Sequence, residues 1–233
     1  MKHYISLTLI LFVTCCRAQP APIVVYDSTY QIRIHPTLPA YFIHFRVVDG
    51  KNADGETACL FSIATHSSID QHLIDSVYYS KKDFEADDLR YIYSSKSYNE
   101  TKPQFYDVNF DGYLDLRMVS FKYNYYDFSY DYYLYNPEEK KFQFSEEFTS
   151  VCNNATIDSK QKTIQLTSTT VRDCGYCWEE KTYRVENNLP VLSQLVISEL
   201  ETINGVSKWK LTTKRNIKGT MKIVHTEYND LRP

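Results

Sequence analysis

The sequence predicts an all-β fold, either an antiparallel β-sandwich or a propeller-like β fold, with one calcium-binding loop and little helix. Short runs rich in β-branched and aromatic residues follow one another along the chain, and turn residues separate them. No helical periodicity intervenes between these runs, which favours antiparallel meanders. The acidic loop occurs in a single copy, whereas a propeller built from repeats would show a period and several such loops.

The first 18 residues are typical of a signal peptide. A short basic start precedes a mostly apolar run at residues 5–13, and Cys16 and Ala18 are the small residues of a cleavage site. We therefore expect cleavage after Ala18 and export to the periplasm or the extracellular space. The apolar run is shorter than the about 20 residues of a membrane-spanning helix. The alternative is a lipoprotein box in which an acylated Cys15 anchors the protein to a membrane.

Beyond the signal peptide we expect two regions. Residues 19–55 form an N-terminal β segment, either separate from the main domain or part of it, and residues 56–233 form an antiparallel β domain. The expected strands lie at residues 23–26, 30–35, 41–48, 57–65, 114–121, 130–135, 163–171, 178–185, 191–200, 207–213 and 220–228. Residues 81–91 are the one stretch that could form a short helix.

The nine residues 107–115 carry the pattern D-x-N-x-D-G-x-x-D, with oxygen-bearing side chains at alternate positions. Ca²⁺ takes about 6–8 oxygen ligands, and a loop with this spacing can turn them inward. Gly112 supplies the sharp turn that such a loop needs. The expected calcium ligands are the side chains of Asp107, Asn109, Asp111 and Asp115 and the backbone carbonyl of Tyr113.

The acidic loop differs from an EF-hand. Position 12 of the loop is Met118 in place of glutamate, and a strand-like run follows instead of a helix. We therefore expect a shorter calcium loop that leads into a strand, with a structural role for the ion. The alternative is a turn in which Asp and Asn side chains bond to their own backbone.

Four cysteines follow the predicted signal peptide: Cys59, Cys152, Cys174 and Cys177. An even number in an exported chain predicts two disulfides, with three pairings open. The spacing Cys174-Gly-Tyr-Cys177 also occurs in redox motifs, where the first cysteine begins a helix. Strand-like residues flank this pair, so we expect a structural role.

Tyrosine is unusually frequent, with 21 residues, seven of them within residues 123–135. On an exposed sheet face such tyrosines would form cross-strand aromatic pairs. On a protein-binding surface they would supply the main contacts. The candidate partner-binding residues are Tyr125, Tyr126, Tyr130 and Tyr132.

Charge and motif content disfavour nucleic-acid binding and catalysis. Of the 26 Lys and Arg residues, Lys2 and Arg17 lie in the signal peptide, so the mature chain has 24 basic and 29 acidic side chains, a formal charge of −5. This balance disfavours nucleic acids and favours a basic partner. Residues 66–72 combine histidines, serines and an aspartate, but no nucleophile motif surrounds them. We expect no enzymatic activity and no membrane span.

These features together resemble a group of exported bacterial proteins related to periplasmic inhibitors of invertebrate-type lysozyme. The group includes immunity proteins that neutralise lysozyme-like effectors. The resemblance rests on the signal peptide, on the line Tyr106–Leu116 around the acidic loop, and on the aromatic strand Tyr133-Leu-Tyr-Asn136 with Lys141-Phe142; it covers residues 57–200.

The resemblance implies an antiparallel β fold with a calcium loop between strands, and a stoichiometric inhibitor in which a loop plugs the cleft of a muramidase. We therefore expect a secreted or periplasmic, calcium-stabilised binding protein whose partner is a lysozyme-like peptidoglycan hydrolase. The alternative is a structural or adhesion module of the cell envelope without inhibitory activity.

Overall fold

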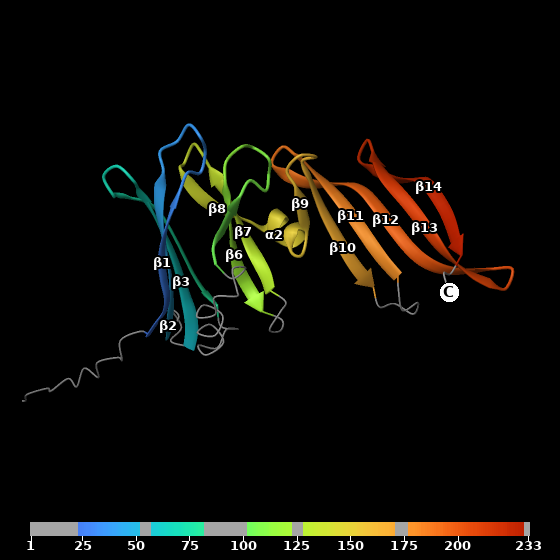
Figure 1. Cartoon of the computed structure of the whole chain (residues 1–233), viewed down its shortest axis with the longest axis horizontal. Helices are drawn as coiled ribbons and strands as arrows, with labels where there is room; N and C mark the ends of the chain where they lie inside the picture. The colour runs from blue at the N-terminus through green and yellow to red at the C-terminus, as the bar shows by residue number, and fades with distance from the viewer. Residues whose placement is uncertain (1–22, 52–56, 82–101, 123–127, 171–176, 231–233) are drawn as a thin grey trace, which may run out of the picture.

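The computed structural model describes residues 23–51, 57–81, 102–122, 128–170 and 177–230. Within these residues the chain forms three antiparallel sheets and one short helix. In each sheet every strand pairs with its neighbours in sequence, so all three sheets are meanders. The sheets follow one another along the long axis of an elongated molecule (Figure 1). The predicted all-β class is confirmed.

The first sheet has one buried face and one wet face. Its order is β1-β2-β3-β4, with β1 at Ile23–Ile32, β2 at Tyr41–Lys51, β3 at Thr57–Ser67 and β4 at Leu73–Lys81. Alternate residues of β2 point into the core, where Ile43 and Phe45 are at most 1% exposed. Between them His44 faces solvent, with its Nε2 2.5 Å from the Asp27 carboxylate. This alternation is typical of an antiparallel sheet that covers a core on one side.

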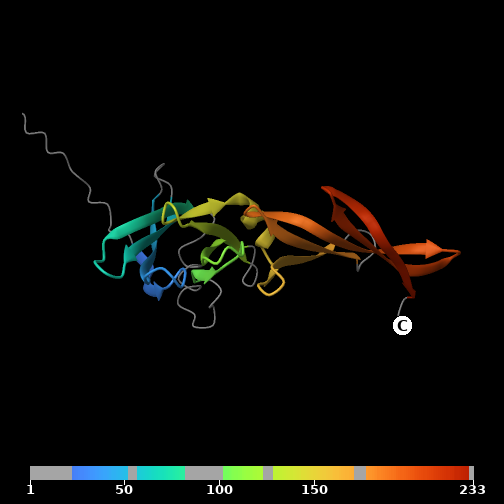
Figure 2. The same cartoon turned by 90° about the horizontal axis from the view of Figure 1, so that it is seen from above.

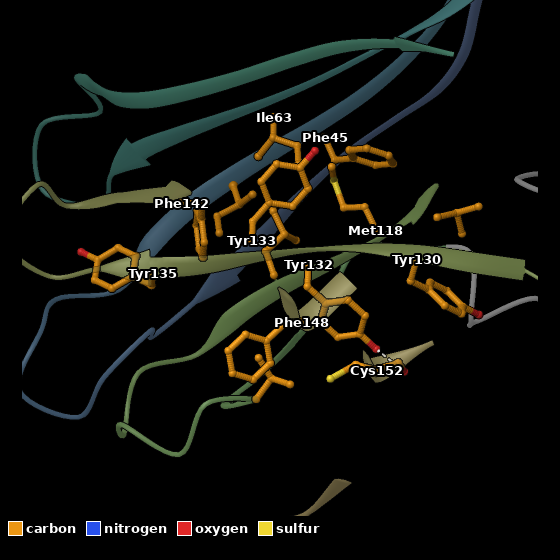
Figure 3. Close-up of a cluster of buried hydrophobic side chains, with 14 of the residues drawn as sticks. Phe45, Ile63, Met118, Tyr130, Tyr132, Tyr133, Tyr135, Phe142, Phe148 and Cys152 are labelled. Atoms are coloured by element: carbon orange, nitrogen blue, oxygen red, sulfur yellow. Dashed lines mark hydrogen bonds between the residues drawn. The ribbon is translucent and has the colours of Figure 1, made fainter. Parts of the chain in front are cut away.

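The second sheet is covered on both faces. It has the order β5-β6-β7-β8, with β5 at Gln104–Tyr106, β6 at Asp115–Lys122, β7 at Phe128–Asn136 and β8 at Lys141–Ser145. Figure 3 shows Tyr133 of β7 on the side of Phe45 and Ile63, and Tyr132 on the opposite side with Phe148 and Cys152. Because both faces are covered, consecutive residues of β7 are buried.

Because both faces of the second sheet are covered, the prediction that Tyr130 and Tyr132 bind a partner is wrong. Tyr130 is 7% exposed and Tyr132 is 1% exposed, so neither can contact another protein. The Tyr132 hydroxyl donates to the Cys152 carbonyl at 3.1 Å and accepts from the Tyr106 hydroxyl at 3.2 Å. The core therefore supplies the polar partners that a tyrosine at a surface takes from water. Tyr125 and Tyr126 lie outside the described residues.

The helix α2, at Glu146–Cys152, was not predicted from the sequence. Ser145 caps it, since its hydroxyl accepts from the Phe148 N–H at 3.3 Å. Two glutamates occupy the first turn, where they interact favourably with the helix dipole. Phe148 and Cys152, four positions apart, bury themselves under β7. The predicted helix falls almost wholly within residues 82–101, which are outside the described part of the chain.

Cys152 overturns the expectation of two disulfides. Its thiol is free and buried, and burial raises its pKa to about 12, so it packs as a small neutral group. Cys177 is disulfide-bonded. Cys174 lies outside the described residues, as does the side chain of Cys59.

The third sheet projects away from the other two (Figures 1 and 2). Its order is β14-β13-β12-β11-β10-β9, with β9 at Thr156–Asp158, β10 at Thr163–Thr170, β11 at Cys177–Glu186, β12 at Leu189–Ile203, β13 at Val206–Ile217 and β14 at Thr220–Asp230. Its inner end joins the core, because Ile164 of β10 is fully buried and α2 contacts β10 and β12. Its outer strands keep much of their side-chain surface accessible.

Two-residue turns connect the long outer strands. The turn residues are Asn187-Asn188, Asn204-Gly205 and Lys218-Gly219, and each has a positive φ between 52° and 82°. Such pairs match the right-handed twist of the strands they join. The sequence located these strands, although β12 and β13 extend beyond the expected ranges. The expected strand at 23–26 and the first three residues of that at 30–35 belong to the single strand β1, and β4, β5, β8 and β9 were not predicted.

No helix in the described part of the chain is long and apolar enough to cross a membrane.

The Tyr132→Phe variant tests the buried hydroxyl pair. We expect a loss of about 1–2 kcal/mol in the free energy of unfolding, because the Tyr106 hydroxyl loses its buried acceptor. Urea unfolding followed by fluorescence measures the loss. The control Tyr228→Phe removes a hydroxyl from a residue that is 44% exposed and should change stability by less than about 0.5 kcal/mol. Equal losses of stability in the two variants would contradict a stabilising role for the buried hydroxyl pair.

Candidate metal-binding loop at the junction of three sheets

The acidic loop connects β5 to β6 and is attached to parts of all three sheets. The Leu114 N–H donates to the carbonyl of Ile34, in the connection between β1 and β2, at 2.8 Å. From the turn between β9 and β10, Lys162 donates through Nζ to the Phe110 carbonyl at 3.4 Å. Asp115 at the end of the loop accepts from the Tyr135 N–H of β7. The loop therefore lies where the three sheets meet.

Within the loop, acidic and amide side chains fold back on the backbone. The Asp107 carboxylate accepts from the N–H groups of Asp111, at 3.0 Å, and Gly112, at 2.8 Å. The Asn109 side-chain oxygen also accepts from Asp111 N–H, at 3.3 Å, so the oxygens of Asp107 and Asn109 lie close together. Gly112 has a φ of 95°, a conformation that a residue with a side chain rarely adopts.

Asp111 completes this inner set. Its Oδ1 accepts from the Tyr113 N–H at 2.8 Å, and its Oδ2 accepts from the Asn109 side-chain amide, also at 2.8 Å. These bonds have the pattern of the Asx turn considered as the alternative to a metal site. They also hold three oxygen-bearing side chains in one small loop, as the spacing of the sequence motif predicts.

Asp115 has a role that the sequence did not reveal. It is 2% exposed, and its two oxygens accept from the N–H groups of Val108 and Tyr135, each at 2.9 Å. Burial raises the pKa of this carboxyl to about 7; the two amide bonds oppose the shift, and the charges of Asp111 and Asp107 add to it. Asp115 thus joins the start of the loop to β7 through buried bonds.

The carboxylates of the loop repel one another. Burial also raises the pKa of Asp107, and the neighbouring Asp111 charge contributes to that shift. Asp107 and Asp115 therefore both hold protons more tightly than isolated carboxyls do. A bound cation would replace this excess of negative charge with attraction.

The donor types fit calcium better than a transition metal. Asp107, Asn109 and Asp111 offer only oxygen, which a hard cation prefers, whereas zinc is usually bound by histidine and cysteine. No group of three or more His, Cys, Asp or Glu side chains within the described residues is placed to hold a metal ion. The Asp115 oxygens bond to Val108 and Tyr135 and not to the turn at residues 109–113. The closely spaced oxygens of that turn therefore come from the carboxylates of Asp107 and Asp111 and the amide of Asn109. Calcium binding here remains a prediction.

A hollow of about 580 Å³ lies beside the loop. The loop, the turn between β7 and β8, and the turn between β11 and β12 line it, through Asn109, Asp111, Tyr113, Leu134, Tyr135, Asn136, Pro137, Glu138, Gln143 and Asn188. Two of these residues belong to an aromatic stack, in which the Tyr113 ring lies between the rings of His35, at 4.5 Å, and Tyr135, at 5.7 Å. The lining of the hollow thus combines polar side chains with stacked aromatic rings.

The histidine-rich stretch at residues 66–72 forms the exposed connection between β3 and β4. The His72 ring lies 2.5 Å from the Asp70 carboxylate, and this bond, with a smaller contribution from Ser67, lowers the pKa of Asp70 to about 2. His66 contacts the Gln71 carbonyl at 3.1 Å. All of these bonds join residues of the same turn, where the Ser67 hydroxyl also accepts from the Ile69 N–H.

Comparison with known proteins shows a similarity of fold but no match to a protein family. No protein-family model matches the chain, and no curated protein sequence does. Among solved structures, the chain is similar to a Xanthomonas type IV secretion system related protein, with a TM-score of 0.51 and 18% sequence identity. The similarity covers 86% of this chain and 99% of that protein, so the two share an architecture over nearly their whole length.

The pH dependence of stability tests the environment of Asp115. Its pKa is about 7 in the folded protein and 3.8 without perturbation, so the stabilisation is complete below pH 3.8 and lost as the pH rises through about 7. In EDTA we expect the free energy of unfolding to fall by roughly 3–4 kcal/mol between pH 4 and pH 7. Urea unfolding at a series of pH values measures this slope.

The Asp115→Asn variant is the control, because its amide cannot titrate. We expect it to lose about 1–3 kcal/mol at low pH, since one backbone N–H loses its acceptor, and to show a much flatter pH profile. A wild-type slope in this variant would assign the titration to other groups.

Proposed function

We propose that the protein is an exported, calcium-stabilised binding protein that acts as a stoichiometric inhibitor of a lysozyme-like peptidoglycan hydrolase. The observation that carries this proposal is the acidic loop, which has the residues of a calcium loop and is attached to all three sheets. An ion held there would stiffen the whole body of the molecule. A stiff scaffold suits a protein that works by binding, because little conformational freedom is lost in the complex.

The structural comparison supports the setting of this proposal. The similar protein is described as related to a type IV secretion system, which fits an exported or envelope-associated role for a chain of the same fold. The predicted signal peptide points the same way. The lysozyme-like target rests on the resemblance of the sequence around residues 106–116 to lysozyme inhibitors and immunity proteins.

The rim of the hollow beside the acidic loop is the surface that we propose for contact with the hydrolase. The Asn136 side chain accepts from the N–H groups of Glu138, at 2.9 Å, and Glu139, at 3.2 Å, and so fixes the turn between β7 and β8. A glycosidase cleft is shaped for a polar sugar chain, so a fixed polar turn can enter it. The negative charge of the mature chain would speed encounter with a basic hydrolase.

Calcium should raise the melting temperature of the mature protein. An ion that binds only the folded state at about 100 times its dissociation constant adds about 2.7 kcal/mol, which corresponds to roughly 5–10 °C for a chain of this size. Differential scanning fluorimetry in EDTA and in excess Ca²⁺ measures the shift. We expect Asp111→Ala to abolish it.

Asn216→Ala is the matched control for the calcium experiment. Asn216 supports the turn between β13 and β14, where its side-chain oxygen accepts from the Gly219 N–H at 2.8 Å, and this turn lies at the outer end of the third sheet, away from the acidic loop (Figure 1). Its loss should lower the melting temperature but leave the calcium response intact. A wild-type protein that melts alike in EDTA and in calcium would eliminate the calcium part of the proposal.

Inhibition should reach completion near a one-to-one ratio. We expect the purified protein to slow the lysis of cell walls by one class of lysozyme, measured by turbidity against enzymes of the c, g and i types. Glu138→Lys should weaken inhibition at least tenfold because it reverses a charge at the rim of the hollow. Lys160→Glu, an exposed reversal in the turn between β9 and β10, should not.

Absence of inhibition across the whole panel would favour a second function, a structural or adhesion module of the envelope. The projecting outer part of the third sheet favours this alternative, because it offers a large surface away from the acidic loop (Figure 2). Release of sugar fragments by the protein alone would instead indicate an enzyme.

A further inference from the structure

The outer edge of the third sheet is open. Among the described strands, β14 pairs with β13 on one side and with none on the other. Ten of its eleven residues are exposed, among them Ile223 at 64% and Val224 at 44%. An exposed edge strand with apolar side chains is a template for pairing with another strand. We propose that β14 pairs antiparallel with β14 of a second copy of this chain. The third sheet of one copy and the third sheet of the other would then form one continuous sheet.

A bulge in β14 limits the registers in which this strand can pair with itself. Thr213 of β13 lies opposite His225, and the next residue, Lys214, lies opposite Ile223, so Val224 is an extra residue. The bulge shifts the alternation of faces by one position. As a result Lys222, opposite Arg215, and Glu227, opposite Leu211, lie on the same face although they are an odd number of positions apart.

This shift selects one register about a two-fold axis perpendicular to the sheet. Residues that lie directly opposite each other in neighbouring strands share a face. For pairs that span the bulge, the two residue numbers must therefore add up to an odd sum. Among such registers, the one centred between Val224 and His225 places Lys222 of each copy against Glu227 of the other. The same register places Met221 against Tyr228, and Thr220 against Asn229.

Charge within one copy favours this arrangement. Lys222 lies directly opposite Arg215 on β13, and like charges in that position destabilise a sheet. Glu227 has the apolar Leu211 on its inner side and only weak contacts, at 3.4 Å, with His225 and Asn229. In the paired sheet the carboxylate of a second copy would lie beside Lys222, and two equivalent ion pairs would form across the two-fold axis.

A bulge and a lysine are also devices that keep edge strands from pairing without control. In β14 the bulge and Lys222 instead restrict pairing to one kind of partner strand. That strand must have the same bulge and must present a glutamate opposite Lys222 and a lysine opposite Glu227. A second copy read in the antiparallel direction has both properties. The interface is isologous, as in most homodimers. The acidic loop, which leads into β6 of the second sheet, lies beyond the opposite edge of the third sheet (Figure 1).

Charge exchange between variants gives a direct test. Lys222→Glu carries glutamate at both positions, so its homodimer would contain two like-charge pairs; Glu227→Lys carries lysine at both. We expect the wild-type mature chain to dimerise in sedimentation velocity experiments between about 1 and about 200 µM, the range of a modest interface. Each single variant should associate about tenfold more weakly.

An equimolar mixture of the two single variants should restore association, because the glutamate introduced at position 222 of one chain would then meet the lysine introduced at position 227 of the other. The double variant Lys222→Glu/Glu227→Lys should recover the dimer as well. Lys160→Glu and Glu186→Lys, exposed reversals away from β14, should leave association unchanged. Circular dichroism and the unfolding midpoint confirm that every variant is folded.

A wild-type chain that stays monomeric throughout the concentration range would overturn the proposal, even if β14 then accepted a strand from a different protein. A dimer that both single variants retain, or that the mixture fails to restore, would place the contact on another surface. The calcium response and the inhibition assay are independent of this result, because the residues exchanged lie outside the acidic loop and the hollow.

Discussion

A buried carboxylate connects the acidic loop to the core of the molecule. Asp115 begins β6, is almost completely removed from solvent, and accepts from the backbone of the loop at Val108 and of β7 at Tyr135. Burial of an ionised group is costly unless its hydrogen bonds are satisfied, so this position depends on both amides. The path of the loop, the start of β6 and the alignment of β7 are thus mutually dependent.

Around this carboxylate the second sheet acts as the central layer. Its side toward the first sheet packs Tyr133 against Phe45 and Ile63, and its other side packs Tyr132 against the helix (Figure 3). Burial on both faces is unusual for an antiparallel sheet and explains how a tyrosine-rich strand came to lie in the core. The hydroxyl of Tyr132 bonds to that of Tyr106 and to a backbone carbonyl, so these polar groups are satisfied inside the layer.

The local features of this chain were readable from sequence, and the long-range ones were not. Alternation in β2 and the asparagine- and glycine-containing turns of the third sheet depend on neighbouring residues, so the strands there were located correctly. Burial of Tyr130 and Tyr132 depends on α2 and on the first sheet, which no local pattern indicates. The same holds for the free thiol of Cys152, because the packing of the helix decided whether this cysteine could reach another one.

In the acidic loop, the spacing predicted which oxygens gather, and the structure shows Asp107, Asn109 and Asp111 in one small turn. The role of Asp115 as a link to β7 depends on Tyr135, twenty positions away, and therefore required the fold. The short helix was signalled by Ser145 and the two glutamates after it, a capping pattern that its aromatic and β-rich surroundings obscured.

The meander order of all three sheets has a consequence for how the chain folds. Every strand finds its partner one hairpin away, so no sheet waits for a distant segment to arrive, and the loops that must close are short. Topologies dominated by nearby contacts fold faster than sandwiches with crossing connections. Each hairpin added at the growing end of the third sheet can therefore assemble on the one before it, from β9 outward, whereas the acidic loop reaches its final arrangement only when three separately formed pieces converge.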